Sequence, residues 1–200
     1  LSHASSETIA DVLTISRAPV LFSHSAAHKV APHPRNLTDD DLRLVAKNGG
    51  VVHVNFFPAF LTAKSVAAYK KRSEAAREFR KSFKNEQQYQ LALPRWLAEN
   101  PLPVTTVADV VDQIDHIVSV AGIDHVGLGS NFDGIVSVPK DLDDVSCFPR
   151  VTQALLDRGY QPEQIRKILG ENTLRVLRDV ERVAASSQNQ DGTVVAATGN

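Results

Sequence analysis

Residues 18–25 read APVLFSHS, an almost continuous apolar run that ends in a serine, a histidine and a serine. Two further runs have the same form, GVVHVNFF at residues 50–57 and HVGLG at residues 125–129. Strands with little polar alternation are typical of parallel sheets that are covered on both faces. The sequence therefore predicts three parallel strands, over Ala18–Ser23, Gly50–Phe57 and His125–Gly129.

Amphipathic stretches between these runs predict helices over Ser6–Arg17, Asp39–Lys47 and Val107–Val120. The second and third begin with the spacing of a capping box, Thr38 with Asp41 and Thr106 with Asp109. Gly122 is expected to end the third helix. A last helix is predicted over Gln164–Ala185, with five apolar side chains facing inward: Ile165, Ile168, Leu169, Leu174 and Leu177.

Alternating strands and helices indicate an α/β fold with a parallel sheet. A fourth strand is expected to end at Ser2–His3, and four such units make half of a (β/α)8 barrel. We therefore expect residues 1–185 to form the C-terminal half of a TIM-type barrel, with a disordered polar tail over residues 186–200. Half a barrel has two open sheet edges, so this part is not expected to be stable alone.

The composition is that of an ordinary soluble globular protein, with 42% hydrophobic and 22% charged residues. A net charge of −1 predicts no nucleic-acid partner, and no run approaches the roughly 20 apolar residues of a membrane span. The one cysteine, Cys147, excludes an internal disulfide. The chain has no methionine, so we expect Leu1 not to be its natural start. The compartment and the oligomeric state stay open, a homodimer being among the assemblies allowed.

Residues 64–84 interrupt the strand–helix alternation and are rich in lysine and arginine. One hypothesis is a helix that binds nucleic acid or an anionic membrane. The other is a solvated helical insertion, over about residues 64–100, that docks its aromatic residues Tyr69, Phe79 and Phe83 on the barrel. Glu74 and Glu78 interrupt the positive charge, which favours the second hypothesis.

The chemistry of α/β barrels lies at the C-terminal ends of their strands. His3 and His24 follow two of the expected strands, and the turn from Gly129 to Gly134 follows the last. Two histidines at neighbouring strand ends could bind one metal ion, although catalytic zinc usually takes three protein ligands. The alternative is that they only form hydrogen bonds. The other histidines considered are expected to be structural or exposed: His33, His53, His116 and His125.

Arg35 lies in the loop after the His24 strand, within Pro34-Arg35-Asn36. Its planar guanidinium could bind a carboxylate through two parallel hydrogen bonds. The alternative is an exposed loop arginine.

Several long segments resemble the membrane (renal) dipeptidase family of zinc peptidases: LSH at the start, SRAPVLFSHSAAHKVAPHPRNLTDDDLRLV, VNFF, VADVVDQIDHIVSVAGIDHVGLGSNFDG, LDDVSCFPR and GENTLRVL. The resemblance runs from residue 1 to about residue 182 and is interrupted by residues 64–100. It implies a (β/α)8 barrel of the metal-dependent hydrolase type that cleaves dipeptides with two zinc ions bridged by a glutamate.

The resemblance also implies roles for individual residues. His3 and His24 match two histidines that bind the second zinc, and Arg35 matches the arginine that holds the substrate carboxylate. The family's His-x-Asp ligands, its bridging glutamate and a histidine that assists the tetrahedral intermediate are expected upstream of this chain.

One position departs from the family pattern, which reads G-S/G-D-F-D-G after the last strand. Here the segment is GSNFDG, so Asn131 stands where the family has its acid/base aspartate, and Asp133 matches the second aspartate. Residue 131 is thus expected at the catalytic and substrate-binding position. The sequence predicts a zinc-dependent dipeptidase, with a catalytically impaired relative that binds metal or ligand without turnover as the alternative.

Overall fold

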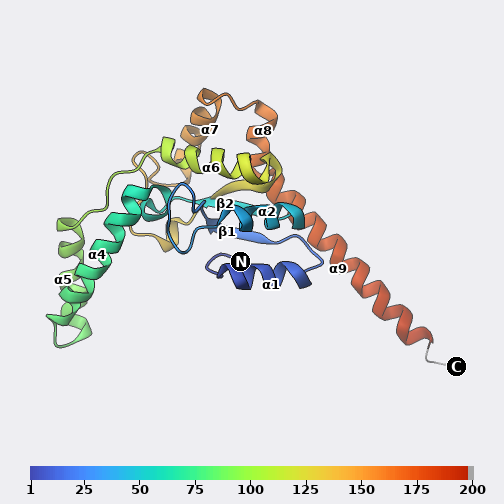
Figure 1. Cartoon of the computed structure of the whole chain (residues 1–200), viewed down its shortest axis with the longest axis horizontal. Coiled ribbons are helices and arrows are strands. Elements are labelled where there is room, and N and C mark those ends of the chain that lie inside the picture. Colours follow the sequence, from blue (N-terminus) through green and yellow to red (C-terminus); the bar gives the residue numbers. More distant parts are fainter. Residues whose placement is uncertain (198–200) are drawn as a thin grey trace.

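The computed structural model describes residues 1–197, and the side chains of residues 1–187. Its centre is a parallel sheet of three strands in the order β1-β2-β3 (Figure 1): Leu21–Ser25, Val51–Asn55 and Val126–Ser130. Leu21 pairs with Val51, and Val52 pairs with Val126. The three predicted parallel strands are confirmed, with boundaries shifted by one to three residues.

The fourth strand predicted to end at Ser2–His3 is wrong in the described chain, because residues 1–5 contain no strand. His3 has a positive φ of 75°, which an extended strand does not allow. The segment still lies beside β1, since the Leu1 amino group donates to the Leu21 carbonyl at 2.7 Å.

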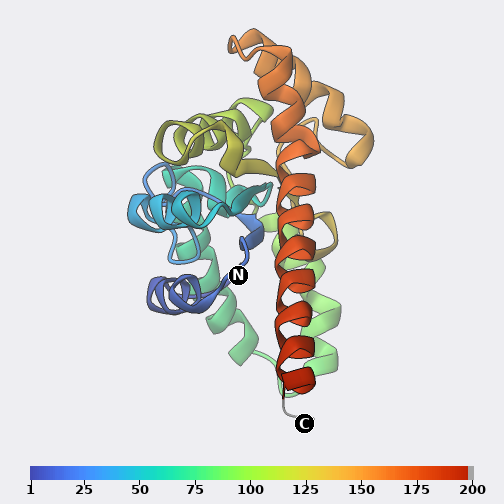
Figure 2. The same cartoon turned by 90° about the vertical axis from the view of Figure 1, so that its right-hand side faces the viewer.

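Three helices with the predicted starting residues pack one beside the next along the sheet (Figures 1 and 2): α1 Ser6–Ile15, α2 Asp39–Asn48 and α6 Val107–Ala121. Both predicted capping boxes form, at Thr38 and at Thr106. Gly122 ends α6 with φ 94°, as predicted. Six apolar residues recur at helical spacing along α6; Val107 and Val118 are partly buried, and four are fully buried against the sheet: Val110, Val111, Ile114 and Ile117.

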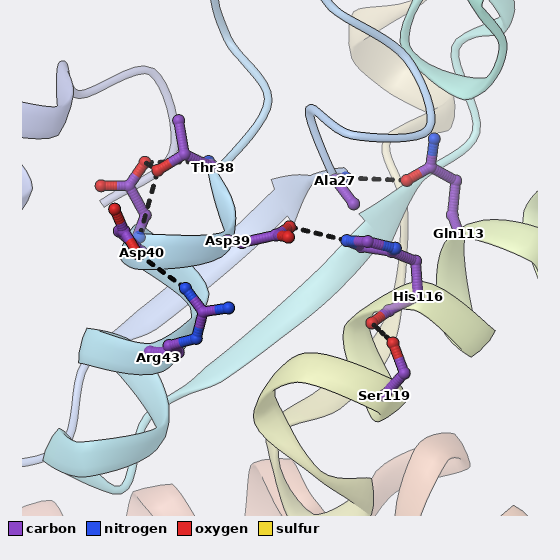
Figure 3. A network of polar contacts seen from close by, with 9 residues as sticks. Ala27, Thr38, Asp39, Asp40, Arg43, Gln113, His116 and Ser119 are labelled. Carbon is purple, nitrogen blue, oxygen red and sulfur yellow. Dashed lines mark hydrogen bonds and ion pairs between the residues drawn. The ribbon is translucent and has the colours of Figure 1, made fainter.

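Polar side chains of α6 connect this helix to the loops at the sheet edge (Figure 3). Gln113 is fully buried and accepts a hydrogen bond from the Ala27 N–H at 2.7 Å. Its amide donates to the carbonyls of Phe60 and Leu61 in α3, Pro58–Leu61. His116 Nε2 lies 2.7 Å from Asp39 Oδ1 at the start of α2. The side chains of α6 thus fix both the loop after β1 and helix α3, which follows β2.

The predicted insertion consists of α4, Ala63–Lys81, and α5, Glu86–Glu99, which extend from the body as an arm (Figure 1). Tyr69 docks on Phe57 with ring centroids 5.5 Å apart. Phe79 and Phe83 do not dock on the barrel and instead pack against aromatic rings of α5, so the prediction fails for these two residues.

After β3 the chain forms short 3₁₀ turns and further helices: η2 Phe132–Gly134, η3 Val145–Cys147, α7 Phe148–Asp157, α8 Pro162–Arg166, a π-helical turn Lys167–Glu171 and α9 Asn172–Ala197. Gly170 within this segment has a non-helical backbone, with φ 173° and ψ −25°, so the chain is kinked between α8 and α9. Ile165 and Ile168 are buried as predicted, and so is Val176. The inward placement of three leucines is wrong, because they are 44–51% exposed: Leu169, Leu174 and Leu177.

Helix α9 continues to Ala197, whereas the sequence predicted a disordered tail from Ser186, and it projects away from the sheet (Figures 1 and 2). Residues 198–200 of that tail lie outside the described residues. Across the described residues, the helices include none with the length and apolar character of a membrane span.

Two polar contacts attach the start of α9 to the sheet. Asn172 donates to the carbonyls of Ile123 and Val126, both at 2.8 Å. His53 on β2, only 8% exposed, lies with Nε2 2.8 Å from Thr173 Oγ1. Burial lowers the pKa of His53 from 6.5 to about 4.

We predict that His53 makes stability of the full-length protein fall with acid. Between pH 6.5 and about 4 the unfolded chain binds more protons than the folded one, so the contribution is complete above pH 6.5 and is lost below it. The loss amounts to about 3 kcal/mol at most. Urea unfolding from pH 4.5 to 7 should show a shallower slope for His53→Gln, which keeps a polar group near Thr173 but does not titrate. Equal slopes for the two proteins would contradict this.

Candidate functional site

The C-terminal ends of β1, β2 and β3 open into a pocket of about 390 Å³. All four side chains singled out from the sequence line it: His3, His24, Arg35 and Asn131. The other lining residues are Phe57, Phe60, Tyr69, Arg72, Gly134, Ile135 and Val136. The strand-end position that the fold predicts is therefore where these polar groups meet.

The two histidines converge on one point. Their Nε2 atoms are 2.6 Å apart, and the rings meet edge to face at 4.7 Å. His24 Nδ1 lies 2.8 Å from Ser23 Oγ, and the His24 N–H donates to Ser2 Oγ. A proton on Nδ1, donated to Ser23, leaves Nε2 free as a metal-binding lone pair.

The charge state of His24 also suits a ligand. Burial lowers the pKa of His24. A lowered pKa favours the neutral imidazole, which is the form that binds metal ions.

The geometry of the pair fits one zinc ion after a small adjustment. Two nitrogens at about 2.0–2.1 Å from a tetrahedral zinc lie about 3.3 Å apart, so the rings would separate by less than about 1 Å. Among the side chains that the structure describes, no group of three or more histidine, cysteine, aspartate or glutamate residues is placed to hold a metal. Residues 1–187 thus fit as the source of two ligands, and a complete site needs more.

Arg35 reaches the same place from the loop after β1. Its Nη2 donates to His3 Nε2 at 2.8 Å, and its guanidinium lies over the Phe60 ring at 5.8 Å. A metal ion at His3 Nε2 would exclude this hydrogen bond and leave the guanidinium free for a ligand. The next residue, Asn36, is buried and donates to the carbonyls of Ala31 and Phe60, which fixes the loop.

Asn131 follows β3 in the left-handed conformation, with φ 74° and ψ 35°. Asparagine and aspartate tolerate this conformation better than most residues. A Cβ on Gly134 would lie 2.5 Å from Asn131 Oδ1, so glycine leaves the space that the side chain of residue 131 occupies. Asp133, which matches the second aspartate of the family pattern, is not among the residues that line the pocket.

The sequence did not identify the apolar wall or Arg72 as part of this site. Phe57 and Phe60 pack edge to face at 5.2 Å in a small buried cluster with Ala26 and Ala59. Arg72 comes from α4, in the segment that was interpreted only as a solvated insertion. One signal was available, since the residues three and four positions from Arg72 on the helix are uncharged: Ala68, Tyr69, Ala75 and Ala76.

The remaining histidines considered contact protein groups other than His3 and His24. His125 Nδ1 lies 2.7 Å from the Gly50 carbonyl, and His33 packs on Phe60 at 4.4 Å. With His53 at Thr173 and His116 at Asp39, these contacts agree with the structural role expected of all four.

The family model of the membrane dipeptidases, peptidase family M19, matches residues 1–191. The chain belongs to this family. It is 37% identical over 188 residues to dipeptidase tcpJ of Claviceps purpurea and 38% identical over 195 residues to dipeptidase ataJ of Aspergillus terreus. These matches cover 94% and 98% of the chain, but the chain spans only 36% and 39% of those relatives.

Solved structures agree on the fold. A probable dipeptidase from Pseudomonas aeruginosa, PvdM, is similar with a TM-score of 0.75 and 32% identity, over 91% of this chain and 50% of that protein. A metallo peptidase from Rhodobacter sphaeroides, liganded with a phosphinate mimic of the dipeptide L-Ala-D-Ala, gives 0.68 and 28%, over 90% of this chain and 41% of that protein. The predicted fold class, part of an α/β barrel of the dipeptidase type, is confirmed.

Proposed function

We propose that the protein containing this chain is a zinc-dependent dipeptidase, in which His3 and His24 bind the same zinc ion. The observation that carries the proposal is the convergence of the two Nε2 atoms beside Arg35, in a pocket at the strand ends of a membrane dipeptidase family chain. A complete site would hold two zinc ions, with its remaining ligands outside residues 1–187. Residues 1–200 alone hold too few ligands for turnover.

Each part of the pocket has a task in this proposal. Zinc, when bound, supplies Lewis acidity that makes a water molecule acidic near neutral pH and polarises a carbonyl. Arg35 binds the free C-terminal carboxylate, which restricts the site to short peptides. Phe57 and Phe60 cover the scissile bond with apolar surface. Residue 131 faces the leaving amine, where an aspartate would move a proton and asparagine can only form hydrogen bonds.

A catalytically impaired protein that binds metal or dipeptide without turnover is the second candidate. Asn131 favours it, since an amide cannot take up and return a proton near neutral pH as an aspartate does. Release of amino acids from a dipeptide by the full-length, zinc-loaded protein separates the two candidates.

We predict that His3→Ala and His24→Ala each remove one bound zinc or weaken its binding at least tenfold in the full-length protein. In this proposal the two histidines bind one zinc ion, so each variant removes one of its nitrogen ligands and leaves the ion too few donors. Zinc content after dialysis against a chelator series measures this. His28→Ala is the matched control, because His28 lies four residues from His24 but does not line the pocket. Unchanged zinc content in both variants would contradict the assignment.

We predict that Arg35→Ala abolishes discrimination between a dipeptide and its C-terminal amide. Loss of a charge-assisted contact to the carboxylate costs about 2–5 kcal/mol where the pair is desolvated. The ratio of kcat/KM for the two substrates measures it. Arg43→Ala is the control, since Arg43 pairs with Asp40 on the exposed face of α2. A variant that discriminates as strongly as the parent would assign Arg35 another task.

We predict that Asn131→Asp raises kcat by about 10²–10⁴-fold, the usual contribution of general acid–base catalysis. The two side chains are nearly equal in size and both tolerate the left-handed backbone, so the zinc content should not change. The measurement is kcat across pH at matched zinc content. Asp133→Asn is the control, two residues away and outside the pocket lining. Rates for Asn and Asp that agree within a few-fold would show that residue 131 is not the proton-transfer group.

A further inference from the structure

Two guanidinium groups, those of Arg35 and Arg72, line the part of the pocket that this chain forms. Within the described part of the chain, neither arginine forms an ion pair. One α-carboxylate of a substrate pairs with only one of these two cations, so the other is available to a second anionic group.

Helix α4 fixes Arg72 over the pocket. Ser65, Tyr69 and Arg72 follow one another at helical spacing on the face that turns toward the sheet. Ser65 is 1% exposed, and the Tyr69 ring packs on Phe57 at 5.5 Å and on His33 at 5.9 Å. One turn beyond Tyr69, Arg72 is partly buried, with its Nη1 donating to the Asn100 carbonyl at a long 3.4 Å. Most of its N–H donors therefore remain available to a ligand.

The other cations of this helix behave differently. Four of them are exposed, Lys64, Lys70, Lys71 and Arg77, while Arg80 and Lys81 pair with Glu86 and Glu78. Of the seven cations of α4 only Arg72 turns inward, and burial lowers its pKa, which reflects the partial loss of hydration. An arginine remains charged under such conditions, so a bound anion would offset the desolvation.

We propose that Arg72 binds a second carboxylate of the substrate, so that the site prefers dipeptides with an acidic C-terminal residue. The inference rests on the proposed function, in which Arg35 holds the terminal carboxylate. The contacts place the groups in sequence: the histidine pair, then Arg35 over Phe60, then Phe57 against Tyr69, and Arg72 one turn further. The side chain of the C-terminal residue branches from the carbon that bears the terminal carboxylate, and in this proposal it extends along the pocket from Arg35 toward Arg72, which lines the same cavity.

The test compares Ala-Glu with Ala-Gln, two dipeptides of the same shape that differ by one charge, in the full-length zinc-loaded protein. We expect kcat/KM to favour Ala-Glu by about 10- to 100-fold, the range for a charge-assisted hydrogen bond. The preference should decrease as salt rises. Arg72→Gln should bring the ratio close to one, and Arg72→Lys should retain part of it. Arg77→Gln, which removes the same charge from the exposed face of α4, should leave the ratio as in the parent.

Binding is measured in parallel, by calorimetric titration of the two dipeptides into the unmodified full-length protein, which has Asn131, and into its Arg72→Gln variant. A preference for Ala-Glu that is lost in Arg72→Gln and kept in Arg77→Gln supports the inference. If both dipeptides are cleaved or bound equally well by the parent, the inference is wrong and the dipeptidase proposal stands. If neither dipeptide is bound or cleaved, the dipeptidase proposal itself fails, and this inference fails with it.

Discussion

The close approach of β3 to its neighbours is the constraint on which the site depends, and two glycines permit it. A Cβ on Gly127 would lie 2.3 Å from Cδ2 of His53, and a Cβ on Gly129 would lie 2.3 Å from the Ser23 carbonyl oxygen. Real side chains do not occupy such distances, so an alanine at either position would push β3 away from the sheet. With glycine there, the end of β3 reaches the end of β1. Asn131 and His24 can then line the same pocket although β2 lies between their strands.

Buried amides then fix the segments that carry the site. Gln113 and Asn36 bind main-chain groups of the loop after β1 and of α3, and Asn172 binds carbonyls at the start of β3. Such buried groups are costly when unpaired, so each amide supports one loop geometry over alternatives. The shape of the site thus depends on polar residues outside the pocket as well as on those that line it. Asn172, for example, belongs to the segment GENTLRVL and binds the carbonyls of Ile123 and Val126, so this segment supports the fold without lining the pocket.

Local signals made much of this fold predictable. The apolar runs of β1 to β3 and the capping boxes at Thr38 and Thr106 depend on neighbouring residues, and the structure has them where the sequence placed them. The strand at Ser2–His3 failed because a single positive φ at His3 overrides an extended pattern. The single inward face predicted over Gln164–Ala185 failed because the chain is kinked at Gly170, and periodicity does not carry one face across such a break.

The candidate site divides in the same way. His3, His24, Arg35 and Asn131 could be named because the strand ends of a parallel sheet must meet, whichever residues form the sheet. Arg72 was not named, because its place depends on how α4 packs against Phe57, a contact between segments that periodicity does not relate. The docking of Tyr69 on the barrel was predicted, but not its place in the pocket. The insertion over residues 64–100 can therefore contribute a residue to the site although its composition is typical of a solvated surface.

The residue at position 131 affects two unusual features of the pocket, its pair of arginines and the asparagine in place of the family's catalytic aspartate. An aspartate there would partly neutralise the field of Arg35 and Arg72, which line the same cavity of about 390 Å³. Asparagine keeps the shape and the hydrogen-bonding capacity but removes that negative charge. The pocket therefore attracts anionic ligands more strongly while it loses the group best suited to proton transfer. An aspartate at position 131 is thus expected to lower the affinity for anionic ligands and to raise turnover. Affinity depends on the net field in the pocket, whereas turnover depends on a titratable group.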